Sequence, residues 1–225
     1  MDQEQLIGDL NTKSRREPGH APRGASFNKN NGILNLDACT LSELIAARAV
    51  SCEEIMTIYL DHIEQTNPAY NAIVSLRDRD DILVEARGKD DLIGRNVRQG
   101  WMHGFPQAIK DLAATKDLRT TQGSPLHRDS IPSRDALFVQ RMKQAGSIVI
   151  GKTNTAEFGL GSQTYNRVFG TTVNAFDRTR TAGGSSGGAA VAVATLMLPV
   201  ADGSDNAGSI RNPAAVTRCA STDML

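Results

Sequence analysis

The sequence predicts an α/β fold with a largely internal sheet flanked by helices. Short apolar segments at residues 70–76, 104–111 and 147–151 alternate with segments of helical periodicity. Strands that alternate with helices are typical of sheets covered by helices. The 225-residue chain is 40% hydrophobic and 22% charged, which excludes wholesale disorder and allows one sizeable core.

Order is expected to begin near Leu36, because residues 1–35 are polar and rich in turn formers; we expect a flexible polar tail there. Two capping boxes follow, Thr40 with Glu43 and Ser51 with Glu54. The second predicts a helix that stops at Asn67-Pro68. A signal peptide is not expected at the start of the chain, and the apolar stretch at residues 187–201 is too short for a membrane span.

The next elements follow from short local patterns. Residues 70–76 predict a strand and residues 78–87 a charged surface helix. Residues 104–111 predict a strand with one lysine near its end, Lys110. Residues 133–146 predict a capped helix closed by a glycine, and residues 147–151 a short apolar strand.

The charge and cysteine content exclude several functions. Lys and Arg balance Asp and Glu at 25 each, which argues against nucleic acid or an anionic membrane as a partner. The three scattered cysteines form neither a disulfide framework nor a metal site with histidine, so we expect no metal and a reducing, cytoplasmic location.

Two loops of small residues carry the chemistry. Residues 183–188 (GGSSGG) open a helix of small residues, and this loop alone fits either a phosphate cradle or a flexible turn. Residues 203–209 (GSDNAGS) form a second loop, in which backbone N–H groups of Asn206, Ala207, Gly208 and Ser209 could converge on an oxyanion.

A serine nucleophile in these loops needs a base. The four histidines are poorly placed for that role: His20, His62, His103 and His127. A lysine can serve if its surroundings disfavour the ammonium, and Lys110, in a segment that otherwise predicts a buried strand, is the best placed. The alternative is a lysine at a strand end that reaches solvent.

The block at residues 183–214, from GGSSGG through a small-residue helix to GSDNAGSIRNPA, resembles the signature segment of the amidase signature family of serine hydrolases. Residues 104–111 resemble the family's lysine segment, and residues 152–161 (KTNTAEFGLG) its linking segment. The resemblance covers about residues 36–215. It implies the amidase-signature fold, of which this chain would carry the N-terminal half.

The resemblance also implies a Ser–cis-Ser–Lys triad. Ser209 would be the nucleophile, Ser185 the bridging serine after a cis peptide from Gly184, and Lys110 the base. Three further residues match family positions that support the loops: Ser186, Asp205 and Arg211. The family reaction uses no cofactor and no metal.

The chain departs from the family in two places. Residues 216–225 do not resemble the family's continuation, and family members are about twice this length, so we expect a truncated chain with a non-matching C-terminal tail. Asn206-Ala207 stands where many relatives carry Thr-Gly, which backbone donors should tolerate.

These observations predict hydrolysis of a carboxamide in a small-molecule substrate. One alternative is a truncated, inactive amidase fragment. A second is an amidotransferase A-type subunit that releases ammonia for tRNA-linked transamidation. A nucleotide-binding module is the weakest alternative, because no lysine directly follows the glycines at residues 183–188. Nothing in the sequence indicates the oligomeric state.

Overall fold

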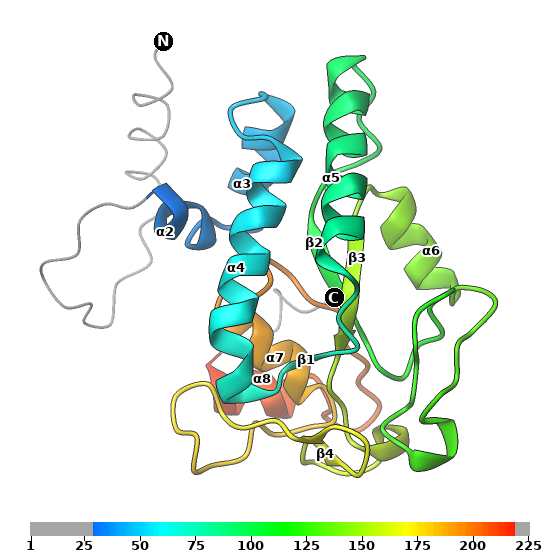
Figure 1. Ribbon diagram of the computed structural model, residues 1–225. Helices are drawn as coiled ribbons and strands as arrows, with labels where there is room; N and C mark the ends of the chain where they lie inside the picture. Colours follow the sequence, from blue (N-terminus) through cyan, green and yellow to red (C-terminus); the bar gives the residue numbers. More distant parts are fainter. Residues whose placement is uncertain (1–28, 219–225) are drawn as a thin grey trace, which may run out of the picture.

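The computed structural model describes residues 29–218 and has a mixed sheet at its centre (Figure 1). The strands are ordered β1 (Ile73–Val74), β3 (Ile148–Thr153) and β2 (Pro106–Lys110). β2 runs parallel to β3, and β1 runs antiparallel to it. β4 (Tyr165–Asn166) and β5 (Gly170–Thr171) form a separate antiparallel ribbon. The predicted α/β class is confirmed.

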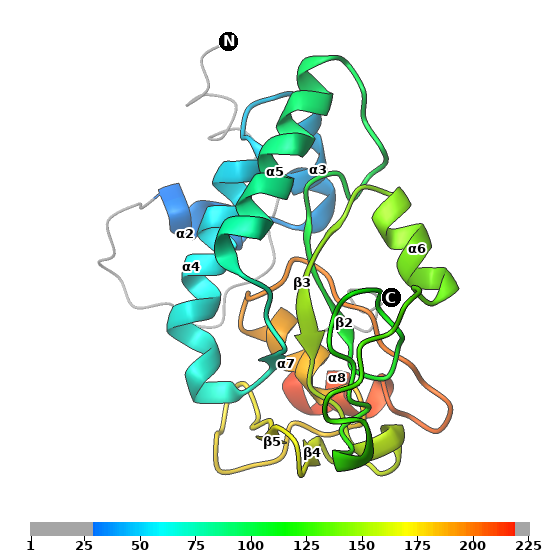
Figure 2. The ribbon, with the colours of Figure 1, turned by 45° about the vertical axis from the view of Figure 1, so that its right-hand side comes forward.

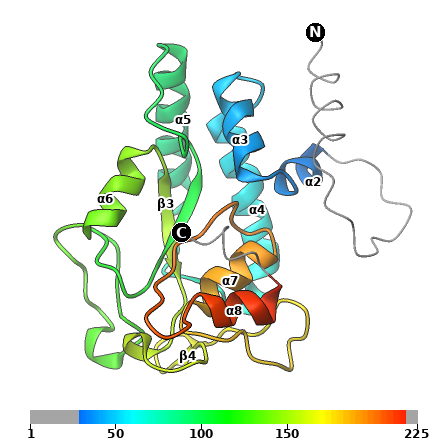
Figure 3. The same ribbon diagram turned by 180° about the vertical axis from the view of Figure 1, so that it is seen from behind.

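Helices surround the sheet, as predicted. α7 contacts all three strands and packs against α8, and these two helices come forward in the view from behind (Figure 3). α4 packs against α5 (Figure 2). The α-helices are α2 (Lys29–Leu34), α3 (Ala38–Ala46), α4 (Cys52–Tyr70), α5 (Arg79–Gly94), α6 (Leu137–Gln144), α7 (Gly187–Ala194) and α8 (Arg211–Thr217), with 3-10 turns η1 (Pro125–His127) and η2 (Glu157–Gly159).

Regular structure continues into the inner ends of both predicted tails. α2 lies within the predicted tail of residues 1–35, because Ile33 and Leu34 are buried in the main core. α8 likewise continues beyond residue 215, and Thr217 is fully buried. The rest of the two predicted tails, residues 1–28 and 219–225, lies outside the described residues.

The helix boundaries confirm one capping box and correct the other. Ser51 and Glu54 form the predicted reciprocal pair at the start of α4. α3 begins earlier than predicted, because the carboxylate of Asp37 accepts from the Thr40 N–H and caps the helix. α4 continues past Pro68 to Tyr70, since a proline in the last turn removes only one hydrogen bond.

Two other helices also differ in length. α5 extends from its N-cap Asp78 to Gly94, seven residues beyond the predicted end. α6 begins at Leu137 without a side-chain cap, so the predicted cap near residue 133 is wrong. The described residues contain no helix with the length and apolar character needed to cross a bilayer.

The two faces of the sheet bury two separate apolar clusters. Ala108 and Ile148 belong to the main core, whereas Ile109 and Val149 pack with Leu118 and Val139 in a smaller cluster on the other face. The register shifts between Gln107 and Ala108, so that Ile109 pairs with Lys152. This bulge turns the Lys152 side chain toward the smaller cluster, away from the face of Lys110.

Candidate active site

Lys110 lies at the end of β2, where all five strand residues are buried. Its ammonium group donates to three serine hydroxyls: Ser185 Oγ at 2.8 Å, Ser186 Oγ at 2.6 Å and Ser204 Oγ at 2.8 Å. The side chain is 2% exposed, so it does not reach solvent as the alternative interpretation required. The strand therefore aims a buried amine at hydroxyls from two loops that are distant in sequence.

The surroundings of Lys110 disfavour its ammonium form relative to an ordinary lysine. Burial lowers the pKa of the amine to about 8, although the carboxylates of Asp202 and Asp205 act in the opposite direction. An amine of that pKa is neutral in about one molecule in ten at pH 7. Lys110 can therefore accept a proton near neutral pH, which an ordinary surface lysine does far less readily.

Ser185 is fixed by its backbone. The predicted cis peptide between Gly184 and Ser185 is present. The Ser185 carbonyl accepts from Thr155 Oγ1 at 3.0 Å, and Thr164 Oγ1, which donates to the Gly183 carbonyl at 2.8 Å, lies 3.4 Å from the Ser185 carbonyl oxygen. A Cβ on Gly184 would lie 2.8 Å from the backbone of Gln163, so only glycine fits there. These contacts leave the Ser185 hydroxyl directed at Lys110.

Ser186 stands at the N-cap of α7, yet its hydroxyl does not cap the helix. It accepts from Lys110 instead, and the Gly187 N–H at the helix start donates to Thr164 Oγ1 at 2.9 Å. Gly188 brings α7 close to the end of β3, because its N–H donates to the Asn154 carbonyl at 3.2 Å. The serine pair is thus held between a helix start and a strand end.

Ser209 lies beside the serine pair but is not bonded to Ser185. The Ser186 N–H donates to the Ser209 carbonyl at 3.0 Å, which joins the two loops. Ser209 is half-buried, and its hydroxyl makes no hydrogen bond within residues 29–218. The structure therefore brings the predicted base and bridging serine together, and leaves the predicted nucleophile adjacent with a free hydroxyl.

Asp205 and Arg211 cross-link the second loop. The guanidinium of Arg211 donates to both Asp205 oxygens at 3.0 Å, and this contact holds the pKa of the Asp205 carboxyl well below its usual range. Asp205 also accepts from the N–H of Gly208 at 2.6 Å. One of the four predicted oxyanion donors is therefore engaged within the loop, which leaves the N–H groups of Asn206, Ala207 and Ser209 as candidates.

Sequence reasoning missed three hydroxyls in this site: Ser204, Thr155 and Thr164. Ser204 lies in the loop that the sequence singles out, but only the fold shows that its hydroxyl meets Lys110. Thr155 donates to the Ser185 carbonyl from the segment at residues 152–161, in which the family resemblance singled out no individual side chain, and Thr164 lies in a segment without a motif. No group of His, Cys, Asp or Glu side chains within the described range could hold a metal ion.

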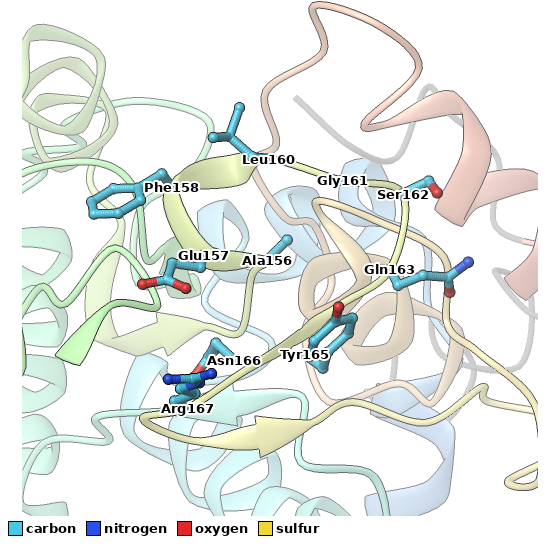
Figure 4. A pocket seen from close by; sticks show the side chains of 10 residues that line it. All are labelled: Ala156, Glu157, Phe158, Leu160, Gly161, Ser162, Gln163, Tyr165, Asn166 and Arg167. Atoms are coloured by element: carbon cyan, nitrogen blue, oxygen red, sulfur yellow. The ribbon is translucent and has the colours of Figure 1, made fainter.

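A pocket of about 650 Å³ lies along the segment that flanks Ser185. Glu157 and Phe158 line one side, and Ser162 and Gln163 the other (Figure 4). The same segment reaches the site, because a Cβ on Gly159 would lie 3.6 Å from Ser185 Oγ. The full lining is Ala156, Glu157, Phe158, Leu160, Gly161, Ser162, Gln163, Tyr165, Asn166 and Arg167.

The structure is thus a mixed α/β fold in which a buried lysine donates to a serine preceded by a cis peptide, the combination that the amidase-signature resemblance implies. The family comparison agrees: the Amidase family model matches residues 54–220. The chain belongs to the Amidase family, and the resemblance stated from the sequence is confirmed.

The relatives share both sequence and fold with this chain. The A-type subunit of glutamyl-tRNA(Gln) amidotransferase from Acidothermus cellulolyticus is 44% identical over 82% of this chain, but the match covers only 36% of that protein. The solved structure of a bacterial aryl acylamidase matches with a TM-score of 0.75 and 34% identity over 80% of this chain and 37% of its own. The solved structure of a 6-aminohexanoate cyclic dimer hydrolase with its substrate matches with a TM-score of 0.73 and 34% identity. That match covers 82% of this chain and 37% of the hydrolase. The chain thus spans well under half the length of these relatives.

Proposed function

We propose that this protein hydrolyses a carboxamide bond through an acyl-enzyme on Ser209. The observation that carries the proposal is the hydrogen bond of 2.8 Å between the buried Lys110 amine and Ser185 Oγ, in a chain that belongs to the Amidase family. Burial lowers the pKa of Lys110 to about 8, so the amine can act as a base near neutral pH.

The proposed reaction has two stages. Ser209 Oγ attacks the amide carbon while its proton passes through the Ser185 hydroxyl to Lys110, and backbone N–H groups of Asn206, Ala207 and Ser209 stabilise the oxyanion. The proton then returns through Ser185 to the leaving amine. Water releases the acid by the same relay in reverse. This sequence requires Ser209 Oγ to approach Ser185 Oγ when substrate binds, a tightening that is common at apo sites.

The substrate that this chemistry fits is a small molecule with an uncharged amide, and the reaction as drawn needs neither a metal nor a cofactor. The neutral overall charge gives no electrostatic reason to propose nucleic acid or a membrane surface as a partner. We place the reaction in the cytoplasm, because the described cysteines, Cys39 and Cys52, are free thiols.

The first test is labelling of the purified full chain with a fluorophosphonate probe, followed by intact mass and peptide mapping. We expect labelling on Ser209, and its loss in Ser209→Ala and in Lys110→Ala. Two matched controls, Ser133→Ala in an exposed bend outside the pocket and Lys116→Ala on the surface, should label like the wild type. A folded wild-type chain that takes no label would contradict the proposal and favour the inactive-fragment hypothesis.

The relatives named as A-type subunits of glutamyl-tRNA(Gln) amidotransferase favour a second candidate, release of ammonia from an amide donor for transfer. It uses the same Ser209 acyl-enzyme and differs in its donor and acceptor. Ammonia release from glutamine, compared with release from simple aliphatic and aromatic amides, separates the two. Preference for glutamine by at least about tenfold would support the amidotransferase candidate, and preference for the other amides would support the hydrolase.

A further inference from the structure

β2 is the outer strand of the central sheet, and a carboxylate caps its free edge at Lys110. The Asp111 N–H donates to the Thr153 carbonyl of β3 at 3.1 Å, so the preceding N–H, that of Lys110, points away from the sheet. It donates to both oxygens of Asp202, at 3.1 and 3.2 Å. Gln107 Nε2 donates to the same carboxylate at 3.3 Å. Asp202 therefore takes the place of a neighbouring strand at this position.

Asp202 also joins the lysine strand to the loop of the predicted nucleophile. It directly precedes Gly203 and Ser204, and Ser204 Oγ is one of the three hydroxyls around the Lys110 amine. Asp202 is 3% exposed, and the two residues before it, Val200 and Ala201, belong to the main core. Any shift of this carboxylate would move the start of the loop relative to the amine that the loop surrounds.

The charge of Asp202 faces two buried lysines. Burial raises the pKa of its carboxyl to about 6, so it is largely ionised at neutral pH. It raises the pKa of Lys110 together with Asp205, and that of Lys152 together with Asp111 and, more weakly, Asp135, whereas Lys143 acts on Lys152 in the opposite direction. α7, which packs against these strands, contributes no ionisable side chain. Of the two carboxylates that act on Lys110, only Asp202 also touches its backbone.

We propose that Asp202 is the positioning residue of the Lys110 amine: its carboxylate fixes the end of β2 and the start of the serine loop, and its charge helps the buried amine to keep its proton. The consequence for catalysis rests on the proposed function. The assignment itself concerns Lys110 and can be tested whether or not the protein is an active hydrolase.

The decisive measurement is an NMR titration of the full chain with lysine labelled at 13Cε, in which Lys110→Arg and Lys152→Arg assign the two buried amines. Removal of a negative charge disfavours the ammonium, so in Asp202→Asn the Lys110 midpoint should fall by about half a pH unit or more. Asp111→Asn is the matched control, because Asp111 faces Lys152: it should lower the Lys152 midpoint and leave that of Lys110 in place. A Lys110 midpoint that is unchanged or raised in Asp202→Asn would overturn the proposal.

A wild-type measurement covers the case in which Asp202→Asn does not fold. Because the Lys110 N–H donates to both Asp202 oxygens, its backbone 15N resonance should move with a midpoint near the carboxyl pKa of about 6. A resonance that stays constant between about pH 4.5 and 7.5 would refute the contact. If the chain takes the fluorophosphonate probe, the acid limb of labelling should also move to lower pH in Asp202→Asn. Absence of labelling would count against the proposed function alone, since both titrations are independent of it.

Discussion

Lys110 and Lys152 stand on neighbouring strands, are both buried, and have a pKa lowered by burial to about 8, yet their surroundings differ. Lys110 meets three serine hydroxyls from the two loops of small residues. Lys152 meets the Ala113 carbonyl at 2.7 Å and the hydroxyls of Thr115 and Thr120 at 2.8 and 3.2 Å, all from one loop.

The two amines differ in the hydrogen bonds that their hydroxyl partners make to other groups. The hydroxyls of Thr115 and Thr120 donate to carbonyls of their own loop, so Lys152 closes a static network that fixes residues 113–120 to the sheet. The hydroxyl of Ser185 makes no such donation within the described part of the chain, and the neighbouring Ser186 N–H donates to the Ser209 carbonyl. A lowered lysine pKa is therefore not enough to mark a base; the hydroxyls around the amine must be free to pass a proton.

The largest expected effect separates the two lysines directly. Lys110→Met should reduce fluorophosphonate labelling by about 10²-fold or more, because it removes the proposed general base. Lys152→Met should keep labelling within about tenfold, but amide exchange in residues 113–120 should become at least about tenfold faster, because the loop loses three hydrogen bonds. Labelling kinetics and hydrogen-exchange mass spectrometry measure the two effects. Equal loss of labelling in both variants would break the comparison.

The pH dependence of the free energy of unfolding should reveal the lowered pKa that the two lysines share. Their folded pKa of about 8 lies below the ordinary lysine value of 10.5, so between these values the unfolded chain binds more protons than the native one. The free energy of unfolding then rises with pH, by about 3 kcal/mol for each lysine over the whole interval. Each methionine variant removes one such contribution. Urea unfolding at about pH 7.5, 9 and 10.5 should show the stability of wild type relative to each variant increasing with pH.

A constant difference between wild type and either variant would contradict that prediction. It would mean that the corresponding amine is solvated as well in the native state as in the unfolded one. Taking differences is necessary because Cys52 titrates over part of the same range in the opposite sense: its pKa is raised from 9.0 to about 12, so its contribution to stability falls as pH rises.

A smaller effect tests how the Lys110 face is built. A Cβ on Gly188 would lie 2.4 Å from the backbone nitrogen of Asn154, so Gly188→Ala must push α7 away from β3 and should lower the free energy of unfolding by about 1–3 kcal/mol. Gly88 in α5 is the matched control, because nothing lies within 4 Å of its added Cβ. Gly88→Ala should stabilise the chain by up to about 1 kcal/mol. Thermal unfolding of both variants measures the two changes in stability, which should have opposite signs. A stabilised Gly188→Ala variant would show that α7 has room to move away from β3.

Much of this site could be predicted because it depends on local pattern. The glycines and serines of residues 183–188 form one continuous segment, and the strand that ends in Lys110 forms another. The resemblance to the family predicted that these two distant segments meet. The capping box at Ser51 is local in the same way. The boundaries of α2 and α8 were missed because tertiary burial of Ile33, Leu34 and Thr217 decides them, and polar neighbours in the sequence conceal that burial.

The roles of Asp202 and Lys152 could not be predicted, for a different reason. Both depend on which side of a strand an atom faces: the Lys110 N–H at the free edge of β2, and the Lys152 side chain after the bulge in β3. A shift of one residue in strand register would turn both the Lys110 N–H and the Lys152 side chain to the opposite side of the strand. No short-range pattern specifies this bulge, since residues 147–151 give the signal of a regular apolar strand.

The smallest effect concerns the third hydroxyl around Lys110. Ser204 is exposed, whereas Ser185 and Ser186 are buried, so its hydrogen bond to the amine competes with water and contributes less. Ser204→Ala should slow labelling by no more than about fivefold, while Ser186→Ala should slow it more, because a buried amine loses a partner that water cannot replace. Labelling rates of the two variants at one pH test this order. The reverse order would mean that the loop start at Ser204, and not the helix start at Ser186, holds the amine in place.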